Sequence, residues 1–103
     1  MSTKVYSKLV RDRIPEIIRA NGEVPVTRIL DDKEYLQELM RKLDEEVAEF
    51  KTDLSLEELA DIQEVVLALA DTITSRTELE KVRVEKVKTR GVFQQKIFLE
   101  RTE

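Results

Sequence analysis

The sequence predicts a mainly α-helical domain, built on a helical hairpin that forms a bundle when two chains pair, with one small antiparallel β ribbon. Two long segments carry apolar residues at helical spacing, and the break between them, 51–55, is so short that they must pair antiparallel. Two further segments have the composition of strands. At 103 residues the chain is expected to form a single domain, 1–103.

The first expected elements are a short helix and an extended segment. A helix over 15–21 has Pro15 in its first turn, and Asn21 with Gly22 ends it. The segment 24–30 is expected to be extended. Because a proline in it cannot donate to a strand ladder, this segment would be an edge strand.

The two longest helices form the predicted hairpin. The first is capped by Asp31, with Glu34 completing a capping box, and runs to about Lys51. The second runs from Ser55 to about Thr74. Each has one apolar stripe, as expected of a helix with one buried face. The stripes are Leu36, Leu39, Met40, Leu43, Val47 and Phe50 in the first helix, and Leu59, Ile62, Val65, Val66, Leu69 and Ile73 in the second.

The last expected elements are a fourth helix and a second strand. The helix starts near Thr77 and ends at Gly91, with a less regular apolar pattern. The segment 93–99 is rich in strand formers. Pairing of this segment with 26–30 would give the predicted ribbon.

Four acidic residues repeat one spacing on the two sides of the hairpin break: Glu46 and Glu49 before it, Glu58 and Asp61 after it. At about 100° per residue, each pair lies on one flank of its stripe, and antiparallel pairing brings both flanks to one side of the seam. Counted outward from the break, Glu49 is level with Glu58, and Glu46 is level with Asp61. Carboxylates this close repel one another unless a cation neutralises them, so the spacing predicts a divalent-metal site.

The residue types narrow the choice of metal. The chain has no histidine and no cysteine, which removes imidazole bases, thiolate nucleophiles and the usual zinc ligands. Hard oxygen ligands favour Mg²⁺, with Mn²⁺ as a possible substitute.

The acidic residues also have a purely structural explanation. Ser55 and Glu58 have capping-box spacing, so Glu58 could simply close the first turn of its helix. Glu45 and its acidic neighbours could be a solvated face, with Lys42 as local partner. The two acidic pairs share the same spacing, lie on the same side of the seam and are level with each other. Chance seldom produces all three, so the pattern favours the metal site.

The acidic motifs resemble those of a known superfamily. The segments 45–49 (EEVAE) and 58–61 (ELAD) look like the EExxE and ExxD motifs of MazG-like, all-α nucleoside triphosphate pyrophosphohydrolases. The segment 8–15 (KLVRDRIP) resembles the opening of a compact branch often labelled phosphoribosyl-ATP pyrophosphohydrolase-like, and 90–93 (RGVF) resembles its C-terminal segment. Two differences are a shorter gap between the motifs and Val92 in place of a second glycine.

The resemblance implies a Mg²⁺-dependent hydrolase that cleaves a nucleoside triphosphate, or a close relative, into a monophosphate and pyrophosphate. Glu46, Glu49, Glu58 and Asp61 would hold one or two Mg²⁺ ions, and Glu45 would orient or deprotonate the attacking water. Catalysis would thus depend on Glu45, Glu46 and Glu49. A homodimer or higher homo-oligomer is expected, both from the resemblance and because a hairpin with two apolar stripes cannot cover itself.

Basic residues are the candidate ligands for the substrate phosphates. They are Lys8, Arg11, Lys88 and Arg90. In the alternative interpretation, Arg11 pairs with Asp12 or Glu16, and the later two neutralise Glu85 and favour their helix C-terminus.

Composition excludes some partners and leaves two alternative functions. The net charge of −4 argues against general nucleic-acid binding. No apolar run approaches the roughly 18 residues of a membrane span, and the N-terminus lacks a signal-peptide core, so a cytoplasmic protein is expected. The alternatives are a true phosphoribosyl-ATP pyrophosphatase of histidine synthesis, and a non-enzymatic helical module whose stripes bind a partner helix.

Overall fold

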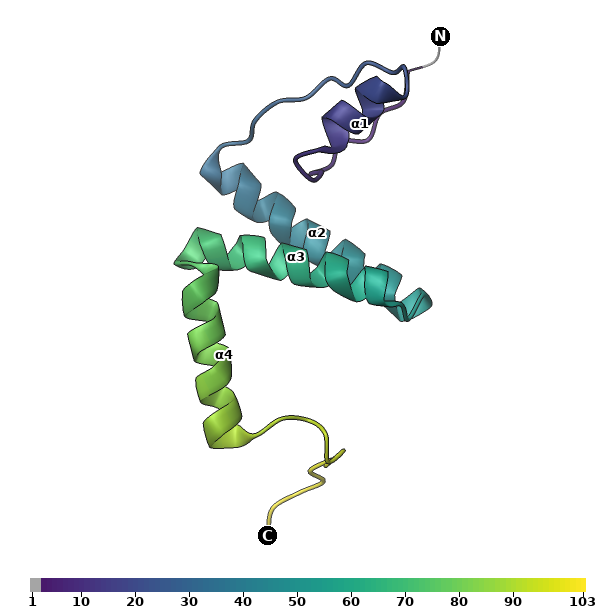
Figure 1. The fold of residues 1–103 in the computed structure, drawn as a ribbon. Coiled ribbons are helices and arrows are strands. Elements are labelled where there is room, and N and C mark those ends of the chain that lie inside the picture. Colours follow the sequence, from purple (N-terminus) through teal and green to yellow (C-terminus); the bar gives the residue numbers. More distant parts are fainter. Residues whose placement is uncertain (1–2) are drawn as a thin grey trace. The chain divides into compact units, whose positions relative to one another are not determined.

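The computed structural model describes residues 3–103, and this part of the chain contains four helices and no strand (Figure 1). The helices are α1 (Ile14–Ala20), α2 (Asp32–Thr52), α3 (Leu56–Ile73) and α4 (Arg76–Arg90). The mainly α-helical prediction is therefore confirmed. The chain divides into two compact units, and the boundary falls inside α3, after Leu69.

The three long helices each begin at a side chain that accepts a hydrogen bond from the backbone of the first turn. Asp31 accepts from the Glu34 N–H at 2.8 Å, Ser55 from the Glu58 N–H at 3.2 Å, and Ser75 from the Glu78 N–H at 3.1 Å. These caps satisfy donors that the helix itself leaves unpaired. The first residues of α2 and α3 are therefore set by these local capping signals.

α2 and α3 form the predicted hairpin, joined by residues 53–55. Leu39 and Val65 are buried, with 3% and 8% of their surface exposed. Other members of the stripes remain open, since Met40 is 48% exposed and Leu59 is 45% exposed. The hairpin therefore buries the centre of its apolar seam and leaves part of both stripes uncovered.

The predicted β ribbon is wrong. The segments 24–30 and 93–99 contain no strand, and apolar side chains in them are open, with Val26 96% and Phe93 100% exposed. In the second segment Lys96 has a φ of 58°, and its N–H lies 3.4 Å from the Phe93 carbonyl, so a turn interrupts the extended run. Strand-forming composition does not stabilise a two-stranded ribbon unless one face packs on something else.

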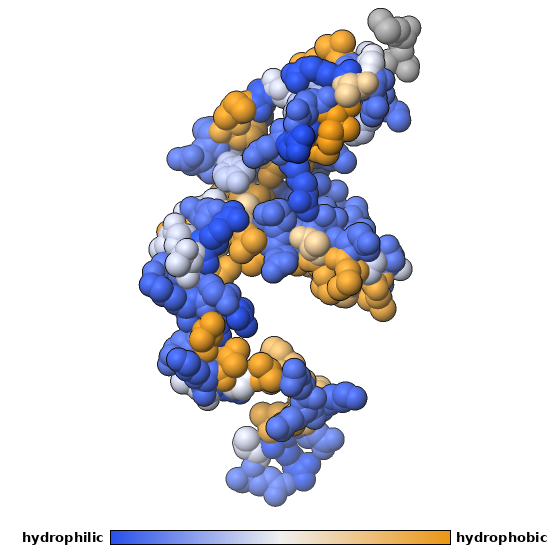
Figure 2. All heavy atoms as spheres, in the orientation of Figure 1, coloured by the Kyte–Doolittle hydropathy of each residue, from blue (hydrophilic) through white to orange (hydrophobic). Residues whose placement is uncertain are grey.

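Hydrophobic side chains are visible at the surface near the connection between α2 and α3 (Figure 2), where Leu54 and Leu56 are 78% and 80% exposed. Among the described residues, no helix combines the length and the apolar character that a membrane span requires.

Candidate metal centre

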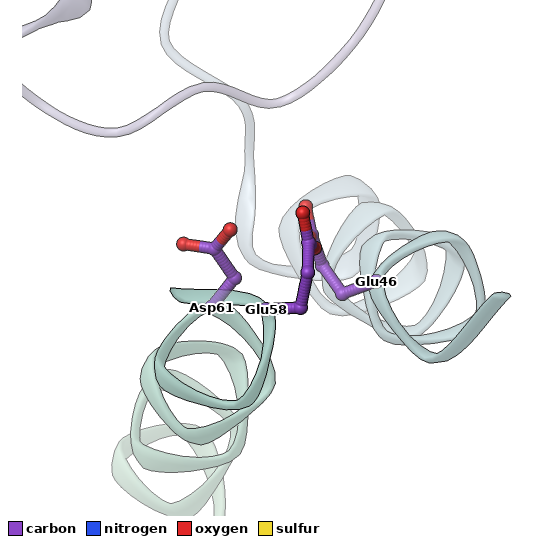
Figure 3. A group of neighbouring side chains, drawn as sticks. All are labelled: Glu46, Glu58 and Asp61. Carbon is purple, nitrogen blue, oxygen red and sulfur yellow. The ribbon is translucent and has the colours of Figure 1, made fainter. Parts of the chain in front are cut away.

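Three carboxylates meet on one side of the α2–α3 hairpin (Figure 3). Glu46 comes from α2, and Glu58 and Asp61 come from α3. One oxygen of each side chain belongs to a group whose members all lie within 4.8 Å of one another. A cluster of this size and composition could hold a metal ion.

Local helix geometry explains how the cluster forms. Glu58 and Asp61 are three positions apart, which places them on the same face of α3. Glu46 reaches them across the seam and is itself buried, with 6% of its surface exposed. A carboxylate buried to this extent is unusual unless it is paired or coordinates a metal.

The alternative role of Glu58 in a capping box can be compared with the hydrogen bonds around Ser55. The Ser55 hydroxyl accepts from the backbone N–H of Glu58, which is the capping half of the motif. The reciprocal half would need the Glu58 carboxylate to accept from the Ser55 N–H, but that N–H donates to the Asp53 carbonyl at 2.8 Å. The cap therefore uses the Glu58 backbone and leaves its carboxylate to the cluster.

Two oxygens of the cluster lack a hydrogen-bond partner within the described part of the chain. They are Glu46 Oε2 and Glu58 Oε2, and both are buried. Buried polar atoms are normally hydrogen-bonded, and an unsatisfied charged oxygen is costly. A divalent cation between the carboxylates would satisfy both atoms. The donor set, oxygen without nitrogen or sulfur, fits Mg²⁺ or Mn²⁺.

The electrostatics of the cluster agree with this interpretation. Burial raises the pKa of Glu46, and the charge of Glu49 raises it further, while Lys42 opposes the shift. Burial also raises the pKa of Glu58, followed by the charges of Glu49, Asp61 and Glu46. Burial and the neighbouring carboxylates thus disfavour the ionised forms of Glu46 and Glu58.

Glu49 and Glu45 occupy more open positions. Glu49 is exposed and lies outside the group of three, although its charge acts on both Glu46 and Glu58. Glu45 is partly exposed, and its Oε1 lies 3.6 Å from the Lys42 ammonium, which is equally 3.6 Å from Glu46 Oε1. Lys42 is therefore the local partner of both glutamates, as one sequence interpretation proposed.

Among the predicted phosphate ligands, only Arg11 contacts the cluster in the described structure. Its Nη2 lies 2.7 Å from Asp61 Oδ1, so it pairs neither with Asp12 nor with Glu16 in the described hydrogen bonds. Lys8 lies over the Tyr6 ring, 5.6 Å from its centroid. Lys88 and Arg90 lie in the last turn of α4, in the second unit.

The contact between Arg11 and Asp61 is a feature of the candidate site that the sequence did not predict. The two residues are 50 positions apart, and Arg11 precedes α1 in a segment with no regular periodicity. Neither spacing nor helical phase connects them. The only available signal was that Arg11 and Asp61 both belong to segments with the same family resemblance.

Comparison with known proteins gives no family for the chain. No protein-family profile matches it, and no solved structure matches it. It is similar to a protein of Mycolicibacterium smegmatis described as uncharacterised, with 62% identity over 45 residues. The match covers 44% of this chain and 46% of that protein, less than half of each.

Proposed function

We propose that this chain is a Mg²⁺-dependent, MazG-like nucleoside triphosphate pyrophosphohydrolase. The observation that carries the proposal is the cluster of Glu46, Glu58 and Asp61, in which two buried carboxylate oxygens lack a partner within residues 3–103. The same residues belong to the two acidic motifs that resemble those of the superfamily. A solvated acidic face would not require a glutamate with 6% of its surface exposed.

The proposed reaction adds one water across the anhydride bond between the α- and β-phosphates, giving a nucleoside monophosphate and pyrophosphate. Glu46, Glu58 and Asp61 would hold the metal, and Glu49 would join them as the fourth carboxylate. Bound there, Mg²⁺ would supply charge stabilisation for the phosphates and the leaving pyrophosphate.

The chain's own residues would bind the anion and move the proton. Glu45 is the candidate residue to orient or deprotonate the attacking water, because the chain has no histidine and the base must be a carboxylate or a metal-bound hydroxide. The partial exposure of Glu45 leaves it accessible to water, and the Lys42 ammonium lies 3.6 Å from its Oε1. Arg11, Lys8, Lys88 and Arg90 remain candidate phosphate ligands.

One observation favours the non-enzymatic alternative. Apolar stripe residues of the hairpin, including Met40 and Leu59, are about half exposed, as in a surface that binds a partner helix. A homodimer would cover the same residues, so this observation does not separate the enzyme from the interaction module. Mg²⁺-dependent activity and Mg²⁺-dependent stability are expected of the enzyme and not of the interaction module.

The decisive experiment measures pyrophosphate release from a panel of standard and modified nucleoside triphosphates, plus phosphoribosyl-ATP, with Mg²⁺ and with chelator. Glu58→Gln is expected to abolish release, whereas Glu57→Gln, its exposed neighbour on α3, is expected to retain it. Release from phosphoribosyl-ATP alone would favour the histidine-synthesis enzyme. No release from any compound by folded protein would favour the interaction module.

A metal titration of thermal stability supplies an independent check. Bound Mg²⁺ stabilises the folded state by mass action, by about 2.7 kcal/mol at 100 times the dissociation constant. The wild type and Glu57→Gln are expected to gain stability beyond a matched salt control, and Glu58→Gln is expected to gain less. A response no larger than that of the salt control in all three proteins would contradict the metal site.

A further inference from the structure

Arg11 already provides one positive charge to the acidic cluster. Its guanidinium Nη2 lies 2.7 Å from Asp61 Oδ1, a short charge-assisted hydrogen bond that joins the segment before α1 to α3. By contrast, Arg13 pairs with Glu16 only three positions away. The bond between Arg11 and Asp61 therefore depends on the tertiary structure of the first unit, and it is directed at one of the three clustered carboxylates.

A guanidinium on Asp61 and a divalent cation in the cluster would compete. The guanidinium and the cation would both bind the Asp61 carboxylate, and two positive charges held by one carboxylate repel each other. The bond lies at the surface, since the Arg11 side chain is 56% exposed and the Asp61 side chain is 39% exposed. Asp61 has Arg11 as an ion-pair partner. Glu46 and Glu58, in contrast, each keep a buried oxygen without a hydrogen-bond partner in the described structure.

We propose that Arg11 is a positioning residue that substitutes for the metal at Asp61 and is displaced when a divalent cation binds, which frees its guanidinium for the phosphate of the ligand. This inference rests on the proposed metal site and adds an order of binding, in which the metal displaces Arg11 from Asp61 before Arg11 contacts the phosphate. Metal binding alone has to break the bond between Arg11 and Asp61. Once a phosphate is present, Arg11 gains a new anionic partner, so phosphate and metal favour each other's binding.

The inference predicts two effects of opposite sign for Arg11→Gln. Without phosphate, the variant is expected to bind Mn²⁺ about tenfold more tightly than the wild type, because no charge-assisted bond has to be broken. At saturating Mg²⁺, it is expected to bind inorganic phosphate about tenfold more weakly, because the guanidinium is missing. A merely structural role for Arg11 would weaken both.

The test is Mn²⁺ binding by electron paramagnetic resonance and phosphate binding by calorimetry, on the full chain. Arg13→Gln is the matched control, since it removes an exposed arginine two positions away whose only described partner is Glu16. It is expected to behave like the wild type in both measurements. Arg11→Lys keeps the positive charge, so it is expected to bind Mn²⁺ as weakly as the wild type does. This result would show that the tighter binding of Arg11→Gln comes from the lost charge and not from a folding defect.

The outcomes distinguish this inference from the proposed function. If the wild type binds Mn²⁺ through Glu58 but Arg11→Gln binds it no more tightly, the role of Arg11 is overturned and the metal site stands. Equal Mn²⁺ binding by the wild type and Glu58→Gln, or none by any protein, would overturn both. Tighter Mn²⁺ binding together with weaker phosphate binding in Arg11→Gln alone would support both.

Discussion

At the scale of single residues, Glu46 best illustrates how burial and charge oppose each other in the acidic cluster. It is 6% exposed, and Lys42 lies near one of its oxygens while the other has no partner in the described structure. Residues chosen for stability alone would be apolar here, because the position lies beside the seam of two packed helices. The free energy lost by burying a carboxylate would be recovered only when a cation binds.

Glu46→Gln is predicted to stabilise the metal-free protein at neutral pH. Burial and neighbouring charges raise the pKa of Glu46 in the fold. A group with a raised pKa contributes stability that is fully present below its unfolded pKa, about 4.3, and is lost as the pH rises through the folded pKa. Thermal unfolding in chelator should therefore favour the variant at pH 7, and the gap should narrow toward pH 4. A lower melting temperature for Glu46→Gln at pH 7, with Glu57→Gln unchanged, would contradict the assignment.

Glu49→Ala and Asp61→Ala are predicted to abolish turnover while the fold is kept. Loss of residues that merely support metal ligands reduces affinity or activity by 10- to 100-fold, so loss of a ligand itself should reduce kcat/KM by at least about 100-fold. Circular dichroism should confirm helical structure in both variants. Glu49 provides the sharper test, because it lies outside the group of three and would have to join it on metal binding. Wild-type rates in both variants would disprove the site.

At the scale of elements, the helices could be predicted because their signals are local. Asp31, Ser55 and the Asn21-Gly22 pair each act within one turn of chain, and all are found at the ends of helices. The three clustered carboxylates could be anticipated for the same reason, since a short connection fixes which helix flanks meet. The absence of the ribbon from residues 3–103 and the bond between Arg11 and Asp61 could not be predicted, because both are decided by contacts between residues far apart in sequence.

Asp71→Asn is predicted to weaken the junction between α3 and α4 in a pH-dependent way. The Asp71 carboxylate accepts from the Arg76 backbone N–H at 3.0 Å and from its guanidinium Nε and Nη2 at 3.1 Å and 2.7 Å. These hydrogen bonds lower the pKa of Asp71. A lowered pKa gives stability that is present above the unfolded value, about 3.9, and lost as the pH falls through the folded value.

Urea unfolding should therefore show Asp71→Asn to be less stable than the wild type at pH 7, with the difference shrinking as the pH falls below the unfolded pKa of about 3.9. Asp44→Asn, at an exposed position on α2, removes the same charge and should change little. An equal loss in both variants would indicate a general charge effect and not a specific link between the helices.

At the scale of the whole molecule, the two compact units divide the predicted site residues. The acidic cluster and Arg11 belong to the first unit, and Lys88 and Arg90 belong to the second. The acidic cluster and its arginine partner are therefore built without the second unit, from one hairpin and the segment before α1. A phosphate-binding role for Lys88 and Arg90 stays a prediction, which the substrate panel can test with Lys88→Gln and Arg90→Gln.

The chain is predicted to form a homodimer through its hairpin. Among the described residues, the buried apolar side chains are those of Leu39, Val65 and Ala70, which is a small core for 103 residues. Leu36 and Met40 on α2 are 40% and 48% exposed although they belong to the apolar stripe. Pairing two hairpins into a four-helix bundle would bury such residues and is a common solution for helical hairpins.

Sedimentation equilibrium at micromolar concentration should give twice the chain mass of 12.0 kDa. Met40→Glu should shift the protein toward monomer, because a charge in the centre of the bundle would be buried without a partner. Val24→Glu, at a position that is 87% exposed and outside the hairpin, should remain dimeric. A stable wild-type monomer would mean that the exposed stripe serves another partner, and the helical interaction module would then become the better account of this surface.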